Sequence, residues 1–136
     1  MSEMKIEALT ENLPEVLAFV DRALEDRGCP AKTQMQIDLA VEELFVNIAQ
    51  YAYHPQVGSA TVKVAILEQP LSVVITLIDQ GRPYDPLAAD DPDITLSAEE
   101  RQVGGLGIYM VKKSMDEIGY EYKDGQNILT IKKKLK

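Results

Sequence analysis

The sequence is poor in the features that disulfides, membrane spans and nucleic-acid surfaces require. It has one cysteine, Cys29, so an intrachain disulfide is excluded, which fits a reducing compartment. No apolar run approaches the roughly 18 residues that cross a bilayer, and no secretory signal pattern is present. Bases are also few, since 14 lysines and arginines stand against 22 acids, a net charge of -8. Because an acidic chain repels nucleic acid and anionic lipid, we expect a cytoplasmic protein that contacts neither directly.

What remains is the composition of an ordinary folded domain. The chain has 136 residues, of which 46% are hydrophobic and 26% are charged. This length suits one core, so we expect a single domain over residues 1–136. One basic cluster, formed by Lys132, Lys133, Lys134 and Lys136, is interpreted as the solvated end of a strand.

Apolar periodicity predicts five strands and three helices. Their order is strand, helix, helix, strand, strand, long loop, helix, strand, strand. This order favours an α+β two-layer sandwich, with a mixed, mostly antiparallel sheet and three helices on one face. The expected strands cover residues 4–9, 60–67, 71–78, 120–123 and 128–135. The expected helices run from the capping residues 10–12 to about 27, from 31 to 53, and from 108 to about 117, where Gly119 breaks the last one.

A long segment without a regular pattern precedes the last predicted helix. Residues 82–103 are dense in proline and aspartate. A loop of this length inside a compact domain is usually functional, so we interpret it as a lid over a neighbouring site. From residue 87 to residue 103, Arg101 is its one basic residue.

Glu43 and Asn47 lie four residues apart on the second predicted helix, so their side chains share one face. They flank the apolar stripe of Leu44 and Ile48, at the edge where a pocket between helix and sheet would open. A carboxylate there can take a proton from a hydroxyl. An asparagine oxygen there can bind Mg²⁺. The spacing alone also fits a solvated acid and amide, and that alternative stays open.

Asp79 follows the almost unbroken apolar run 73–78. A carboxylate at the end of a buried strand needs a donor, and the exocyclic amine of adenine is one such donor. Gly81 would let the backbone pass close to a flat base. These two residues, and Asp85 before Pro86, could instead form only a turn at the end of a strand.

Gly104, Gly105 and Gly107 surround Leu106 directly before the last predicted helix. Free backbone N–H groups and the positive end of the helix dipole favour phosphate at such a terminus. The motif lacks the lysine of a Walker A loop and the preceding strand of a Rossmann fingerprint. A flexible hinge is therefore the alternative.

The three motifs in this order resemble the GHKL (Bergerat-fold) ATPases, and most closely the anti-sigma-factor serine kinases. Residues 40–53 read AVEELFVNIAQYAY, which is similar to the AVxExxxNxxxHAY of that branch. Residues 79–86 read DQGRPYDP, similar to DxGxxFDP. Residues 104–116 read GGLGIYMVKKSMD, similar to a GxG motif that opens a helix ending in Met-Asp. The resemblance covers nearly the whole chain.

The resemblance implies a Bergerat fold and a part in transcription regulation. The chain would bind ATP and Mg²⁺, phosphorylate a serine or threonine on a STAS-type antagonist protein, and sequester a sigma factor. It would form a homodimer, for which the exposed first strand offers an interface. Glu43 would be the general base and Asn47 the Mg²⁺ ligand. Nucleotide contacts would come from Asn47, Asp79, Gly81, Asp85, Gly104, Gly105, Leu106, Gly107 and Thr130. Apart from the resemblance, we expect Arg101 to bind the nucleotide at its terminal phosphate or to contact a partner, with a solvated charge as the alternative.

Departures from the family pattern keep alternatives open. Tyr51 stands where the branch has histidine, and Arg82 with Pro83 stands where many relatives have a second glycine. The threonine often found in the adenine pocket corresponds to Asn127 or to Thr130, depending on the alignment. A nucleotide-gated binding module without kinase activity is a second hypothesis, against which the intact Glu43 and Asn47 argue. The ATPase domain of a two-component system is a third, less favoured because no phosphoacceptor helix is evident.

Overall fold

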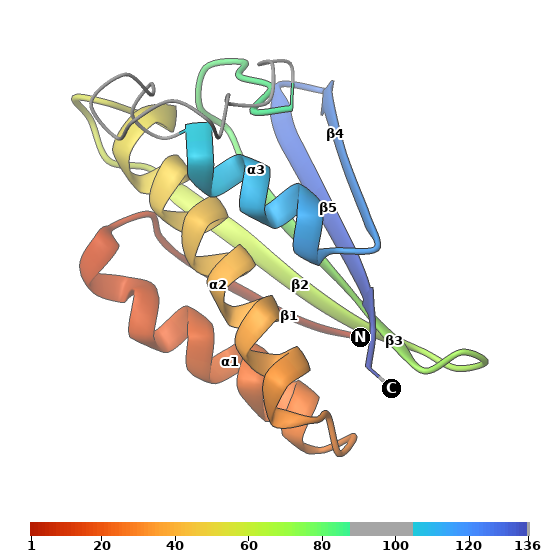
Figure 1. The fold of residues 1–136 in the computed structure, drawn as a ribbon. Helices are drawn as coiled ribbons and strands as arrows, with labels where there is room; N and C mark the ends of the chain where they lie inside the picture. Colours follow the sequence, from red (N-terminus) through yellow and green to blue (C-terminus); the bar gives the residue numbers. More distant parts are fainter. Residues whose placement is uncertain (88–104, 136) are drawn as a thin grey trace.

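A computed structural model describes residues 1–87 and 105–135 of the chain. It has two layers, a five-stranded sheet and three α-helices that lie on one face of it (Figure 1). The strand order is β1-β2-β3-β5-β4. The strands are β1 (Ser2–Glu7), β2 (Ser59–Leu67), β3 (Ser72–Asp79), β4 (Glu117–Lys123) and β5 (Gln126–Lys134), and the helices are α1 (Leu13–Glu25), α2 (Ala31–Asn47) and α3 (Gly105–Ser114).

The expected α+β two-layer sandwich is confirmed, with one refinement in the sheet. All four strand pairings are antiparallel, so the mixed character that we expected is absent from the described strands. The reason is that β2–β3 and β4–β5 are hairpins with short turns, which join antiparallel strands only.

Two boundaries near the last helix differ from the sequence prediction. α3 begins at Gly105 rather than at residue 108, so Gly105 and Gly107 lie inside its first turn. α3 ends at Ser114, so Gly119 does not end this helix as predicted; Gly119 lies within β4, where it pairs with Thr130. Packing on α2 and the ladder with β5 override the weak local preference of glycine in these places.

The start of α1 also differs from the prediction. Residues 10–12 form a short 3₁₀ turn, and neither Leu9 nor Asn12 caps a helix with its side chain. Asn12 Nδ2 instead donates a hydrogen bond of 2.9 Å to Glu7 O, which ties the turn to the end of β1.

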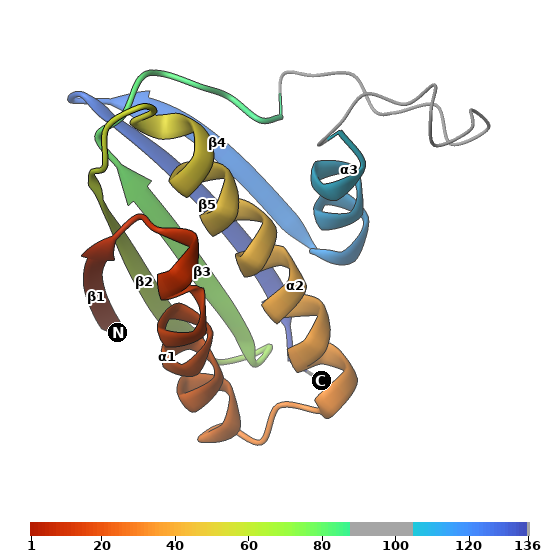
Figure 2. The same ribbon diagram turned by 90° about the vertical axis from the view of Figure 1, so that its left-hand side faces the viewer.

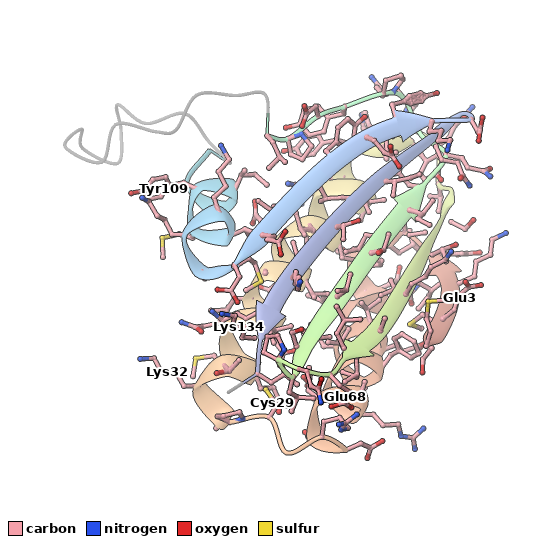
Figure 3. All side chains as sticks on the ribbon, turned by 90° about the vertical axis from the view of Figure 1, so that its right-hand side faces the viewer. Glu3, Cys29, Lys32, Glu68, Tyr109 and Lys134 are labelled. Atoms are coloured by element: carbon pink, nitrogen blue, oxygen red, sulfur yellow. The ribbon has the colours of Figure 1, made fainter. Side chains whose placement is uncertain are left out.

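The core lies between the helices and one face of the sheet. Along β5, Asn127, Leu129 and Ile131 are buried beneath the helices, while Ile128 and Thr130 alternate with them on the other face. Figure 3 views the sheet from that other face, which none of the described helices covers. The fully buried helix residues are Val16, Val20, Leu24, Ile37, Val41, Leu44 and Phe45.

Helix α2 runs diagonally over the middle of the sheet, with α1 on the β1 side and α3 on the β4 side (Figure 2). Its C-terminal end reaches the end of β3, since Arg82 N donates to Ala52 O at 3.0 Å. Among the described helices, none combines the length and the apolar character that a membrane span needs.

The two-residue turn between β4 and β5 requires a glycine. Asp124 (φ 54°) and Gly125 (φ 77°) both take positive φ, as in a type I′ turn. Gly125→Ala should lower the free energy of unfolding by about 1 kcal/mol, because a Cβ is strained in this region. Urea denaturation followed by circular dichroism measures the change.

Gly119→Ala is the matched control in the same hairpin. A Cβ at Gly119 would meet no atom within 4 Å, and Gly119 does not have positive φ. Its substitution should be neutral or slightly stabilising. Equal destabilisation by both substitutions would contradict the argument from turn geometry.

Candidate functional site

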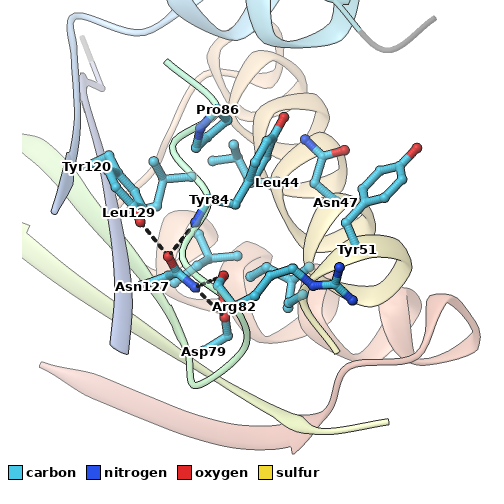
Figure 4. Close-up of a pocket in the computed structure, with 13 residues that line it drawn as sticks. Leu44, Asn47, Tyr51, Asp79, Arg82, Tyr84, Pro86, Tyr120, Asn127 and Leu129 are labelled. Atoms are coloured by element: carbon cyan, nitrogen blue, oxygen red, sulfur yellow. Dashed lines mark hydrogen bonds between the residues drawn. The ribbon is translucent and has the colours of Figure 1, made fainter. Parts of the chain in front are cut away.

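A pocket opens between the C-terminal end of α2 and the adjoining ends of β3 and β5 (Figure 4). Its floor is apolar, and its polar side chains are few and convergent, which is the usual composition of a small-molecule site. The lining residues are Leu44, Asn47, Ile48, Tyr51, Ala52, Leu77, Asp79, Arg82, Tyr84, Pro86, Tyr120, Asn127 and Leu129. The fold thus brings together three segments that are far apart in the sequence.

Asp79 is the last residue of β3, and only 5% of it is exposed. Its Oδ1 accepts hydrogen bonds from Gly81 N and from Asn127 Nδ2, both at 2.9 Å. Its Oδ2 accepts none from the described residues. Because Asp79 as a whole is almost fully buried, a hydrogen-bond donor at this second oxygen would be favourable. The pocket that Asp79 lines is the place from which a ligand could supply one.

The structure separates Asn127 from Thr130, the two residues between which the sequence left a choice. Asn127 stands opposite Asp79 in the β3–β5 register and lines the pocket. Thr130 alternates onto the face of the sheet that is turned away from the helices. The fold therefore brings Asn127, and not Thr130, to the site.

Gly81 and Asp85 shape the loop after β3, and neither is among the residues that line the pocket. A Cβ at Gly81 would collide with the carbonyl group of Ala52, so glycine is required for the loop to pack against the end of α2. Asp85 is exposed, and its Oδ1 accepts a hydrogen bond of 2.8 Å from Leu87 N. This is the local turn that aspartate favours.

Helix α2 continues as a π-helical turn, Ile48–Ala52, directly after Asn47. π-Helical turns are rare in proteins overall, and those that occur are often found at functional sites. This turn places Tyr51 in the pocket wall and presents Ala52 O to the backbone N–H of Arg82. The sequence predicted a helix to residue 53, which is one residue beyond the observed end at Ala52, and it did not predict the change of helix type.

Tyr53 fastens the loop after β3 to the rest of the domain. Its hydroxyl donates to Ser59 O and accepts from Gln80 N, both at 2.7 Å. Burial raises the pKa of the Tyr53 phenol. These bonds hold the residue next to Asp79 in place.

Glu43 and Asn47 lie on the side of α2 that meets the pocket and α3. Asn47 lines the pocket, and its side-chain amide bonds to none of the described residues, so its oxygen is available to a ligand. Burial raises the pKa of Glu43, and the negative charge of Glu42 raises it further. A carboxyl group with a raised pKa next to a pocket is a candidate general base.

Helix α3 brings the glycine motif to Glu43. A Cβ on Gly107 would collide with the Glu43 carboxylate, so the first turn of α3 passes directly over that side chain. Gly105 and Leu106 form the start of the same helix. Glu43 and Gly107, which are 64 positions apart in the sequence, therefore meet in space. Gly104 and Arg101 lie outside the described residues.

The chemistry of these residues fits a nucleotide and Mg²⁺. Asn47 offers a hard oxygen, Asp79 offers an acceptor for an amine, and the start of α3 offers backbone N–H groups for phosphate. Within residues 1–87 and 105–135, no group of three or more His, Cys, Asp or Glu could hold a metal. This is compatible with Mg²⁺, which usually combines one or two protein ligands with substrate phosphates and water.

Sequence reasoning did not identify Arg82, Tyr84 or Tyr120 as pocket residues. Tyr84 N donates to Asn127 Oδ1 at 3.1 Å, and the Tyr120 hydroxyl donates to the same oxygen. The guanidinium of Arg82 donates to His54 O. A signal existed for Tyr84, which occupies the phenylalanine position of the DxGxxFDP motif. Tyr120 required the β4–β5 register, which the sequence did not provide.

Comparison with known proteins agrees with this geometry. Residues 6–133 match the family model of the histidine kinase-like ATPase domain. The serine/threonine-protein kinase BtrW of Bordetella bronchiseptica is 29% identical over 109 residues, which cover 80% of this chain and 75% of that protein. The serine-protein kinase RsbW of Bacillus cereus is 26% identical over 134 residues, which cover 96% of this chain and 82% of that protein.

Solved structures show the same fold. The RsbU and RsbW domains of a Mycobacterium tuberculosis protein align with a TM-score of 0.65 at 16% identity, covering 99% of this chain and 33% of that chain. The histidine kinase domain of an Erythrobacter litoralis blue-light activated kinase aligns with a TM-score of 0.57 at 17% identity, covering 93% of this chain and 60% of that chain.

Fold and site together define a two-layer α+β domain of the ATPase class, with its pocket between one helix and the sheet. The chain belongs to the histidine kinase-like ATPase domain family.

The raised pKa of Glu43 predicts how its removal affects stability. When folding raises the pKa of a carboxyl group, its contribution to stability is fully present at pH values below the ordinary pKa of 4.5. This contribution is lost as the pH rises through the raised pKa of the folded state. Glu43→Gln should therefore be more stable than the natural protein at pH 7, by less than about 1 kcal/mol because solvent screens a partly exposed group. Urea denaturation at pH 7 and pH 4 measures the difference.

Most of the gain should disappear at pH 4, which lies below the ordinary pKa of 4.5, because the Glu43 carboxyl is then mostly protonated in both states. Glu121→Gln, which changes an exposed glutamate of β4, is the control for the loss of one negative charge at the surface. If Glu43→Gln instead becomes less stable than the natural protein as the pH is raised from 4 to 7, the raised pKa of Glu43 is contradicted.

Proposed function

We propose that this protein is an ATP-dependent protein serine/threonine kinase of the anti-sigma-factor type. Acting in the cytoplasm, it phosphorylates a serine or threonine of a STAS-type antagonist and sequesters a sigma factor. The names of its relatives as serine kinases support this proposal. The observation that carries it is the contact of the Glu43 carboxylate with the first turn of α3, beside the pocket that holds Asp79 and Asn47.

Three parts of the site divide the recognition of ATP. Asp79 Oδ2 accepts a hydrogen bond from the exocyclic amine of the base. Asn47 contributes the amide oxygen that would bind Mg²⁺. The backbone N–H groups of Gly105, Leu106 and Gly107 contact the phosphates at the start of α3. Arg101 and Gly104 keep their predicted roles as phosphate contacts. Bound Mg²⁺ supplies neutralisation of phosphate charge.

Glu43 acts on the hydroxyl of the protein substrate. Its carboxylate takes the hydroxyl proton while the oxygen forms a bond to the γ-phosphorus. The bond from that phosphorus to the bridging oxygen of ADP breaks in the same step. The raised pKa of Glu43 brings its proton affinity closer to neutral pH, where a base is most effective. Positioning by α2 and α3 supplies most of the remaining rate.

The test is transfer of labelled phosphate from ATP to the STAS-domain protein encoded nearest to this gene. Glu43→Gln should lower the transfer rate about a hundredfold or more, because the proton acceptor is lost. Calorimetry should show that its affinity for Mg·ATP stays within about threefold, since no assigned nucleotide contact is removed.

Glu42→Gln is the matched control, because it changes an exposed glutamate next to Glu43 on the same helix. It should retain most of the transfer rate, because it removes only the smaller cause of the raised Glu43 pKa and leaves burial, the larger one, in place. Undiminished transfer by Glu43→Gln would remove the general-base assignment. ATP-dependent binding of a sigma factor by the natural protein, with no transfer to any antagonist, would identify a nucleotide-gated binding module instead.

A second variant tests the same carboxylate without deleting it. Gly107→Ala places a methyl group where the Glu43 carboxylate lies, so the carboxylate must turn aside. Transfer should fall although Glu43 is present. The fold should be kept, because the displaced atoms are the flexible end of a side chain. Transfer at the natural rate would show that this contact is not needed for the reaction.

We also propose a homodimer that forms through β1. β1 is an edge strand of the described sheet and pairs on one side only, with β2. An unpaired edge offers backbone groups to a second strand. Sedimentation velocity should give twice the 15.1 kDa of one chain. A monomer throughout the micromolar range would contradict this proposal.

A further inference from the structure

The amide nitrogen of Asn127 ties the end of β3 and its loop to β5 (Figure 4). Nδ2 donates to Asp79 Oδ1 and to Arg82 O, each at 2.9 Å, and reaches Gly81 O at 3.5 Å. All three partners are oxygens that can only accept a hydrogen bond. One amide group therefore holds both the carboxylate and the backbone that follows it.

The amide oxygen of Asn127 is held as firmly as the nitrogen. Oδ1 accepts from Tyr84 N at 3.1 Å and from the Tyr120 hydroxyl. A backbone N–H can only donate, so turning the amide over would set a donor against a donor and an acceptor against acceptors. Only 5% of Asn127 is exposed, so water cannot replace these bonds at low cost.

This network decides what Asp79 offers to a ligand. With Oδ1 occupied by two N–H donors, the carboxylate cannot rotate freely, and Oδ2 is the acceptor left toward the pocket. An acceptor there suits a base with an amine at the contacted position, as in adenine. Guanine carries a carbonyl at that position, which would set two acceptors against each other.

We propose that Asn127 is the positioning residue that makes this pocket select an adenine over a guanine nucleotide, by locking the Asp79 carboxylate and the loop from Gly81 to Tyr84 in one arrangement. The inference rests on the proposed ATP binding and names the determinant of base choice. Because Asn127 also holds Tyr84, it links base recognition to the beginning of the segment 82–103.

The experiment measures the affinities of non-hydrolysable ATP and GTP analogues with Mg²⁺ by calorimetry. Asn127→Asp places an oxygen where Nδ2 donates, against the acceptors of Asp79 and Arg82. Its affinity for the ATP analogue should fall about tenfold or more, because buried acceptors lose their donor. Its affinity for the GTP analogue should fall less, so the ratio of the two affinities decreases.

Two further variants keep the inference testable if Asn127→Asp fails to fold. Tyr120→Phe removes only the hydroxyl that donates to Asn127 Oδ1, and should shift the ATP-to-GTP ratio in the same direction by a smaller factor. Thr130→Ala changes the same strand on the opposite face of the sheet and should leave the ratio unchanged.

The outcomes separate this inference from the proposed function. A lower ratio in Asn127→Asp or in Tyr120→Phe, with no change in Thr130→Ala, supports the inference. Equal loss of both affinities, with the ratio unchanged, overturns it and leaves Asn127 a structural residue while ATP binding stands. A natural protein that binds neither analogue overturns the proposed function, and the inference with it.

Discussion

The hydrogen bond between the Asp79 carboxylate and the Asn127 amide is the interaction on which the site depends. It joins residues 48 positions apart, and it forms because the antiparallel register of β3 and β5 sets them side by side. Each residue is 5% exposed, so removing either one would leave the other as a buried polar group with one hydrogen bond fewer. Their hydrogen bond offsets the cost of burying two polar side chains at one end of a pocket whose floor is otherwise apolar. It also fixes the start of the loop that leads away from the sheet.

The second constraint is the close approach of α3 to α2. Gly107 lacks the Cβ that would displace the Glu43 carboxylate, so the glycine motif serves packing in addition to its proposed role in phosphate binding. Gly81 has the same kind of role at the other end of the pocket, against the Ala52 carbonyl. The first turn of α3 and the loop after β3 therefore both pack against α2 and its π-helical end. The raised pKa of Glu43 follows from burial at this junction.

Much of the fold could be predicted from the sequence because apolar periodicity is a local signal. The order of the five strands and three helices was expected. The errors lie where tertiary packing outweighs local preference. Gly119 reads as a breaker but pairs within β4, and α3 starts among glycines because it packs on α2.

For the site, the sequence by itself determined the residue types and their order: Glu43 and Asn47 on one helix, Asp79 at the end of a strand, and glycines at the start of another helix. These follow from helix spacing, strand burial and backbone freedom, which are properties of short segments. Only the tertiary structure decided that Asn127 and not Thr130 reaches the pocket, and that Tyr84 and Tyr120 hold it there. The physical reason is register, because a shift of one residue along a strand moves a side chain to the other face of the sheet.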